Sequence, residues 1–373
     1  MSDLCERFGI PISGDSPGSL GPNEIVWRNR QPWLAEQGYM LRPRYRKDWV
    51  PSWGSLENYD VTAEDAMFLM GSARIDATQT STGRIVNLKA VEKSIHPHEA
   101  EISQFFSTEP LASHPRNHCC PLLEVLSPPD EPDVLILVTP LLRQLNKPLM
   151  ESAGEAAEFF RQVFEGLQFM HQCHVAHRDC MELNIMMDPQ HMFPHGYHPR
   201  AILSTHDLKR PAPYRSRMAS RPKYFFIDFG LSRQYDPADA EPLEDVIRGG
   251  DKTVPEFQDD DTGPLNPFPT DIYYLGNMIR ETFLEQSRGL EFMQPLVDDM
   301  VQIDPSKRPT IDIVVQRFED ILRGLSRWKL RSRLHHFNQF GPKRWGVGEQ
   351  IGFYARTFMY ILSARDPLPR PRG

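Results

Sequence analysis

Asp179, Asn184 and Asp228 have side chains that could bind a magnesium ion and accept a proton. Asp179 and Asn184 come just before a short apolar run at residues 185–187, and Asp228 directly follows a second run at 224–227. Both runs are the size of strands, so we expect them to bring the three polar side chains to one point. Carboxylate and carboxamide oxygens suit Mg²⁺, which keeps other positions for phosphates. Asp228 and Asn184 would bind the metal, and Asp179 would accept a proton from a hydroxyl group.

The elements that must position these residues follow from the apolar pattern. Alternation predicts a strand over residues 84–91 after a turn at Thr82 and Gly83, then a short helix over 99–106 and two strands, at 121–126 and 134–139. From Ser152 onward the pattern is helical, with Ser152 and Glu155 spaced as a capping box. Further helices are predicted over 271–283 and 310–322, and residues 188–223 read as a long surface insertion.

Two motifs follow one another in this order. Residues 177–184 read His-Arg-Asp-x4-Asn, and residues 228–230 read Asp-Phe-Gly. Together they resemble the catalytic loop and the metal-binding motif of eukaryotic protein kinases. The resemblance covers residues 65–325, and with its Trp- and Arg-rich leader the chain looks most similar to kinase-domain proteins of mushroom-type fungi.

The resemblance implies an α+β, two-lobed protein kinase-like fold, with a small β-rich N-lobe and a larger helical C-lobe. It implies ATP and Mg²⁺ as ligands and phosphoryl transfer to a hydroxyl of a protein substrate. The expected divisions are a Trp/Arg/Pro-rich extension (1–62), an N-lobe (63–142), a C-lobe (143–325) with an insertion at 188–223, and a basic aromatic tail (326–373).

Further matches imply roles in the large lobe. Residues 253–256 resemble the Ala-Pro-Glu that ends the activation segment, and residues 304–310 resemble a late Arg-Pro motif. By this analogy Glu256 and Arg308 form a buried ion pair. Asp271 resembles the family's helix-start Asp, which braces the catalytic loop.

In the small lobe Lys89 matches the lysine that contacts the α- and β-phosphates. Its expected partner is Glu101, with Glu99 as the alternative. Thr139, Pro140 and Leu141 stand where the hinge that contacts adenine would be.

Three departures from the family pattern bear on activity. No G-x-G-x-x-G loop precedes Lys89, Asn87 stands where a small residue is usual, and Met181 replaces a catalytic-loop lysine. A lost hydrogen bond to a charged group is worth about 1.5–3 kcal/mol, which is roughly ten- to a hundredfold in rate. We therefore expect an active, atypical protein kinase; the alternative is a pseudokinase scaffold that binds a protein partner with weak or no phosphotransfer.

The bulk composition limits the remaining possibilities. The chain of 373 residues has a formal charge of −8, which argues against binding nucleic acid. Five irregularly spaced cysteines, no signal-like leader and no apolar run long enough for a membrane span predict an intracellular, cytoplasmic protein. For the tail we expect a solvated helix packed on the large lobe, with membrane or partner contact as the alternative.

Overall fold

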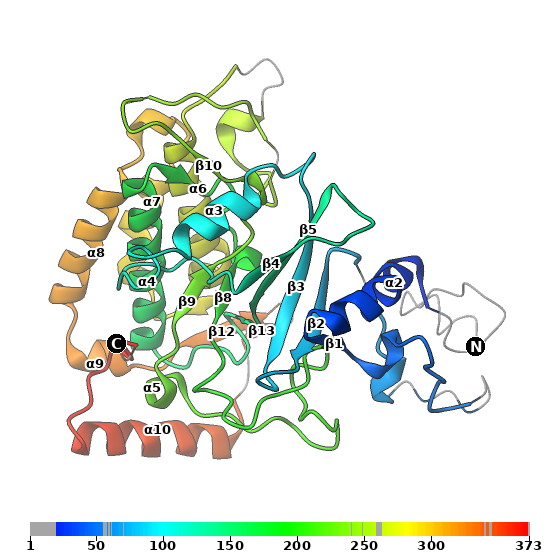
Figure 1. Cartoon of the computed structure of the whole chain (residues 1–373). Helices are drawn as coiled ribbons and strands as arrows, with labels where there is room; N and C mark the ends of the chain where they lie inside the picture. Colours follow the sequence, from blue (N-terminus) through cyan, green and yellow to red (C-terminus); the bar gives the residue numbers. More distant parts are fainter. Residues whose placement is uncertain are drawn as a thin grey trace. The chain divides into compact units, whose positions relative to one another are not determined.

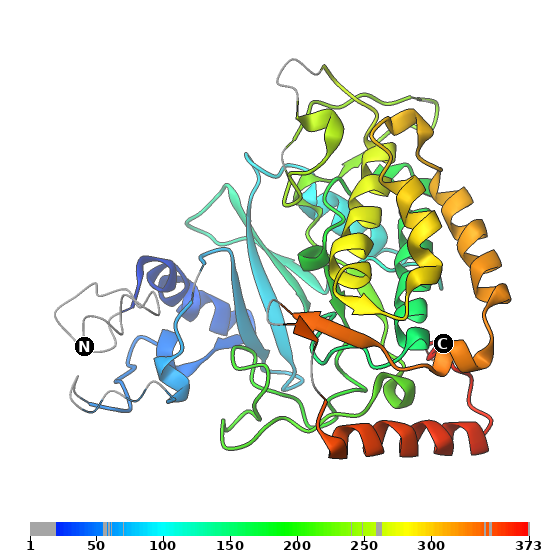
Figure 2. The ribbon, with the colours of Figure 1, turned by 180° about the vertical axis from the view of Figure 1, so that it is seen from behind.

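The computed structural model describes residues 20–54, 58, 60, 62–69, 71–239, 241–247, 249–258, 263–338, 341–342 and 345–371. The chain forms two compact units, each made of several segments. The first unit contains Met1–Ala100, Pro121–Leu141 and His195–Pro213, and the second contains Glu101–Cys120, Leu142–Pro194 and Tyr214–Gly373. The expected domain boundaries stay a prediction. Figures 1 and 2 show the elements of both units.

The first unit is built on one antiparallel sheet of five strands in the order β1-β2-β3-β5-β4. The strands are β1 (Tyr39–Leu41), β2 (Arg74–Gln79), β3 (Ile85–Glu92), β5 (Val134–Pro140) and β4 (Glu124–Leu126). In β3, Val86 and Leu88 are buried on one side, as the apolar alternation predicts. Leu88 lies opposite Val138 of β5, which is also buried, so the register places both in the same core.

The N-terminal segment belongs to this sheet. Helix α2 (Pro22–Glu36) places the fully buried Trp27 in the core of the unit, and the indole Nε1 donates a hydrogen bond to the carbonyl oxygen of Ser72 at 2.7 Å. Strand β1 pairs along β2, from Tyr39 opposite Gln79 to Leu41 opposite Ala77. Figure 1 shows α2 beside β1. The described residues 22–41 of this Trp-rich segment therefore pack as part of the first unit.

The second unit is mainly helical. Its α-helices are the long α4 (Ala153–Gln172), α5 (Arg217–Ser220), α6 (Pro267–Ile279), α7 (Gln294–Met300), α8 (Ile311–Gly324), α9 (Arg327–Arg331) and α10 (Val347–Leu362), and α3 (Glu99–Phe106) ends in this unit. Ser152 caps α4, since its hydroxyl accepts a hydrogen bond from the Glu155 backbone N–H at 3.2 Å. Phe164 of α4 and Phe318 of α8 pack edge to face, with ring centroids 5.2 Å apart.

Short antiparallel strands complete the second unit. They are β6 (Arg143–Gln144) with β8 (Ile185–Met187) and β9 (Tyr224–Phe226); β7 (Val175–Ala176) with β10 (Arg233–Gln234); and β11 (Ser287–Arg288) with β12 (His335–Asn338) and β13 (Gly341–Pro342). The pairing of β8 with β9, Ile185 opposite Phe226, confirms the two strands expected beside the polar residues.

The segment at 188–223 is more than a surface loop. Phe193, Tyr197 and Arg217 within it are each at least nine-tenths buried. The guanidinium of Arg217 donates to the carbonyl oxygens of Leu145 and Leu149, at 2.6 and 3.1 Å. The expectation of a surface segment is therefore wrong for these side chains, whose spacing carries no helix or strand period.

The combination of helices with antiparallel sheets confirms the α+β class. None of the helices in the described part of the chain is both long and apolar enough to cross a membrane. Of the basic tail residues, Lys343 and Arg344 lie outside the described residues.

Candidate functional site

Asp271 of α6 fixes the loop that carries Asp179. Its fully buried carboxylate accepts hydrogen bonds from the backbone N–H groups of His177 and Arg178, at 2.8 and 2.6 Å. Arg178 has a φ of +66°, a left-handed conformation that costs free energy in a residue with a side chain. The two charge-assisted hydrogen bonds to Asp271 hold the loop in this shape.

Asp179 and Asn184 are in direct contact. The Asn184 side-chain Nδ2 donates to Asp179 Oδ2 at 2.7 Å and to the Asp179 carbonyl oxygen at 3.0 Å. The other carboxylate oxygen, Oδ1, accepts the backbone N–H of Gly250 at 2.9 Å. Because Asn184 donates with Nδ2, its Oδ1 is the atom that could bind a cation.

Asp228 lies at the same place, because the strand before it is tied to the Asn184 loop. The Ile227 N–H donates to the Asn184 carbonyl oxygen at 2.9 Å. Asp228 itself has a left-handed backbone, with φ +68° and ψ +70°. The next residue, Phe229, is buried against Phe106, with ring centroids 6.1 Å apart, which holds this turn in place. The structure therefore brings together Asp179, Asn184 and Asp228, as the sequence predicts.

The electrostatics of the site suit a proton acceptor. Burial is the main effect that raises the pKa of the Asp179 carboxyl, and the negative charge of Asp228 adds to it. The Gly250 N–H, His177 and Asn184 act in the opposite direction. A carboxyl whose pKa is raised toward neutrality is a better general base than an exposed aspartate.

Lys89 pairs with Glu99, which corrects the expected pairing with Glu101. The Lys89 Nζ donates to Glu99 Oε1, and the Glu99 side chain is 2% exposed. Glu99 is the first residue of α3, and Glu101 lies two positions on, about 200° further round the helix. Glu101 is accordingly exposed to solvent. Sequence spacing alone could not show which helix face meets β3.

Two residues singled out in the sequence contact each other in the first unit. The Asn87 Nδ2 on β3 donates to the hydroxyl oxygen of Thr139 on β5 at 3.1 Å, and the two residues are direct cross-strand neighbours. The unusual amide at position 87 therefore has a polar partner within the sheet. Pro140 pairs opposite Val86, and Leu141 follows directly. The assignment of Thr139, Pro140 and Leu141 to an adenine hinge stays a prediction.

Glu256 and Arg308 form the buried ion pair expected from the sequence. The guanidinium donates two parallel hydrogen bonds to the carboxylate, at 2.7 and 2.6 Å, and the Arg308 side chain is fully buried. The Thr270 hydroxyl also donates to Glu256 Oε1, at 3.0 Å. This bidentate pair fixes the segment after Gly250 to the start of α8.

Three residues near Asp179 escaped the sequence reasoning. Gly250 supplies the N–H described above. Glu244 pairs with Arg178, whose Nη1 is 3.1 Å from the Glu244 carboxylate. Tyr274 lies on the buried helix α6, where an aromatic residue does not stand out. Its buried hydroxyl has no hydrogen-bond partner among the described residues. Burial and the charge of Asp179 raise the pKa of this Tyr274 hydroxyl.

The contacts of Gly249 show why this position, next to Gly250, requires a glycine. A Cβ at Gly249 would lie 2.7 Å from Asp179 Oδ1 and 3.5 Å from the Tyr274 hydroxyl oxygen. Only a residue without a side chain lets the backbone approach the carboxylate this closely. The glycine pair at 249–250 is the signal that could have marked this contact in the sequence.

The donor set fits a magnesium ion better than a transition metal. Asp228 and Asn184 offer oxygen atoms, which Mg²⁺ prefers, and phosphates commonly complete its shell. Across the described ranges no group of three or more His, Cys, Asp or Glu side chains could hold a metal by itself. Such an ion would thus depend on ligands from a bound phosphate compound or water.

No protein-family model matches the chain, and a search of curated proteins finds no match either.

Proposed function

We propose that the chain is a protein kinase-like phosphotransferase, which moves the terminal phosphoryl group of magnesium ATP to a protein hydroxyl. The two compact units would be the small and large lobes of a kinase-like fold. The observation that carries this proposal is the direct contact of Asp179 with Asn184 beside Asp228, on a loop braced by Asp271. The likeness to kinase-domain proteins of mushroom-type fungi, seen in the motifs, stays a proposal.

Each residue of the set has a distinct task in this reaction. Asn184 and Asp228 would hold the magnesium ion, which offsets charge on the phosphates when bound. Asp179 would orient the acceptor hydroxyl and take its proton while the oxygen attacks the γ-phosphorus and the bond to ADP breaks. Lys89, held by Glu99, would contact the α- and β-phosphates.

Glu256 and Arg308 support a protein kinase over a small-molecule kinase. Their bidentate geometry, with the Arg308 side chain fully buried, is what the resemblance to the end of the activation segment implies. Glu256 and Arg308 come from two motifs that are separate from residues 177–184. Their pairing is therefore a second line of support, independent of the Asp179 loop.

A pseudokinase scaffold is the second candidate, and one contact favours it. Both carboxylate oxygens of Asp179 already accept hydrogen bonds, one from Gly250 and one from Asn184. Met181, in place of a lysine, packs against Gly250. A partner-binding domain could keep this arrangement permanently, whereas in an enzyme the acceptor hydroxyl would have to reach a remaining lone pair of one of these oxygens.

The first test is thermal melting of the full chain with and without magnesium ATP. A ligand at about a hundred times its dissociation constant stabilises a protein by about 2.7 kcal/mol. The second is transfer of radiolabel from ATP to a generic protein acceptor. Asp228→Ala removes a proposed metal ligand, and Asp320→Ala removes an exposed carboxylate on α8 as the matched control.

The two measurements together separate the candidates. The enzyme is supported if magnesium ATP raises the melting temperature and radiolabel is transferred to the acceptor. Asp228→Ala should then abolish the transfer, and Asp320→Ala should leave it intact. A shift without transfer supports the scaffold. If millimolar magnesium ATP produces no shift, the nucleotide-binding proposal is wrong in both forms.

A further inference from the structure

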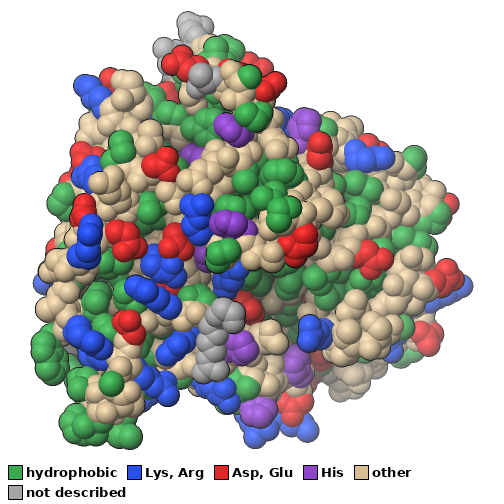
Figure 3. All heavy atoms as spheres, turned by 60° about the vertical axis from the view of Figure 1, so that its left-hand side comes forward, with side chains coloured by type: hydrophobic (Ala, Val, Ile, Leu, Met, Phe, Trp, Pro, Cys, Tyr) green, Lys and Arg blue, Asp and Glu red, His purple; other side chains and the backbone are tan. Residues whose placement is uncertain are grey.

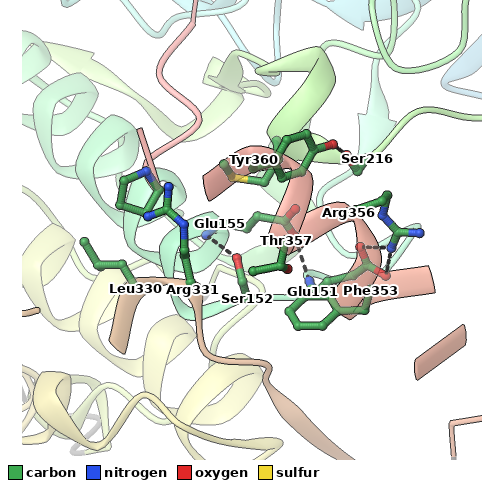
Figure 4. Close-up of a pocket in the computed structure, with 12 residues that line it drawn as sticks. Glu151, Ser152, Glu155, Ser216, Leu330, Arg331, Phe353, Arg356, Thr357 and Tyr360 are labelled. Carbon is green, nitrogen blue, oxygen red and sulfur yellow. Dashed lines mark hydrogen bonds and ion pairs between the residues drawn. The ribbon is translucent and has the colours of Figure 1, made fainter. Parts of the chain in front are cut away.

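Helix α10 is attached to the second unit by its polar residues. Arg356 donates to both carboxylate oxygens of Glu151, at 2.8 and 2.9 Å, and the hydroxyls of Tyr360 and Ser216 are 2.9 Å apart. Phe353, one turn before Arg356 on α10, is 5% exposed. Figure 4 shows these side chains pointing from α10 into the pocket that it covers. The face of α10 that meets the protein is therefore settled.

The opposite face of α10 consists of apolar side chains exposed to solvent. Six large residues are each at least 60% exposed: Val347, Ile351, Tyr354, Phe358, Met359 and Leu362. Spacings of three, four and seven place five of them on one side of the helix, and Met359 lies at the edge of that side. The charged residues of the helix, Glu349 and Arg356, lie on the other side. A surface helix normally has the reverse arrangement.

The C-terminal sequence that contains α10 is strongly basic. Residues 326–373 contain ten Lys and Arg and two Asp and Glu, a formal charge of +8 in a chain whose total is −8. Helix α9 lies at the end of α10, where Arg331 Nη2 donates to the Arg365 carbonyl oxygen at 2.5 Å. Trp328 of α9 is 73% exposed. Figure 3 shows Lys and Arg gathered at the lower left, beside hydrophobic side chains along the edge.

We propose that the outward face of α10 docks on an anionic lipid surface, with the exposed Arg327 of α9 and the exposed Arg365 and Arg370 after α10 near the headgroups. A helix with one apolar side, aromatic residues and adjacent cations has the composition of an interfacial helix that lies in the membrane plane. This inference is independent of the proposed phosphotransfer.

The charge distribution favours lipid over a second copy of this chain. A two-fold contact through α10 would bring the same basic segment of each copy together, and like charges would oppose it. An anionic bilayer instead offers opposite charge and a medium for the apolar side chains at once.

The experiment is co-sedimentation of the full chain with vesicles. One set contains phosphatidylcholine alone, and the other adds about 30 mol% phosphatidylserine. We expect binding to the anionic set, weaker at high salt because the charges are screened. Ile351→Asp and Phe358→Asp should each lower binding at least about tenfold, since a charge replaces an inserted apolar group. Ile303→Asp, which changes a residue 78% exposed outside α10, is the matched control.

Thermal melting and sedimentation velocity complete the test. If either Asp variant fails to fold, the uncharged Ile351→Ser and Phe358→Ser replace it. Binding to anionic vesicles that falls with α10 variants and not with Ile303→Asp supports the inference. No binding to anionic vesicles, or unchanged binding of the α10 variants, overturns it. So does a wild-type dimer that Phe358→Asp converts to monomer, because a second copy then covers the face.

Discussion

The backbone N–H of Gly250 donates a hydrogen bond to Oδ1 of Asp179, at 2.9 Å. If the chain is the protein kinase-like enzyme proposed above, a lysine two residues after the aspartate would supply a cation here, and this chain has Met181 instead. Gly250 and Asn184 together satisfy both carboxylate oxygens without a positive charge. The orientation of Asp179 is thereby kept, whereas the positive charge that would stabilise the phosphoryl group in the proposed reaction is missing.

Met181→Lys should therefore increase phosphoryl transfer. A hydrogen bond from a charged donor contributes about 1.5–3 kcal/mol, so we expect a rate higher by roughly ten- to a hundredfold. Radiolabel transfer at saturating ATP measures it, with Met181→Leu as the uncharged control of similar size. A Lys variant no faster than the Leu variant would show that the missing cation does not limit the rate.

Asp179→Asn should remove activity and change the pH dependence of stability. The pKa of Asp179 is raised on folding, so its ionised form is disfavoured in the folded protein. Wild type should lose stability relative to the Asn variant as the pH rises from the ordinary Asp range through this raised pKa. Melting temperatures at about pH 4 and about pH 7.5 test this sign. A wild type that gains stability relative to the Asn variant as the pH rises would contradict the raised pKa.

Glu99→Gln should affect the protein much more than Glu101→Gln. Glu99 is 2% exposed and accepts from Lys89, so neutralising it weakens a buried charged hydrogen bond and should cost about 1–3 kcal/mol of unfolding free energy. Glu101 is exposed, and its replacement should change stability by less than about 0.5 kcal/mol. Urea unfolding measures both. Equal effects would mean that the Lys89 partner is misassigned.

Arg308→Met should destabilise the second unit. It leaves the Glu256 carboxylate buried with the Thr270 hydroxyl and without its guanidinium, a loss of about 3–5 kcal/mol for a broken buried pair. Arg323→Met, which breaks an exposed pair with Asp320, is the matched control and should cost less than about 1 kcal/mol. Chemical denaturation distinguishes the two. Similar losses would refute the contribution assigned to burial.

Local periodicity and motif spacing predicted the parts of the molecule that depend on neighbouring residues. The strand at 84–91, the helix at 99–106 and the paired runs at 185–187 and 224–227 all formed with bounds within one or two residues. The Asp179, Asn184 and Asp228 cluster followed from those strands.

Contacts set by tertiary packing were not readable in the sequence. The choice of Glu99 over Glu101 depends on how α3 is rotated relative to β3, which no local pattern fixes. Gly250 donates through its backbone N–H, so the glycine pair at 249–250 could indicate a close backbone approach but not which side chain accepts the hydrogen bond. Tyr274 resembles any core aromatic until its hydroxyl is seen near Asp179.

The pairing of β1 with β2 affects how far the chain could be shortened at its N-terminal side. Strand β1 covers one side of β2, from Tyr39 opposite Gln79 to Leu41 opposite Ala77, and Trp27 of α2 fills the core beneath. A protein shortened to residues 65–325 would lack β1 and would leave the N–H and C=O groups of β2 unpaired along that side. Such a fragment would present a template for strand addition by other chains, so its hazard is precipitation rather than mere loss of stability.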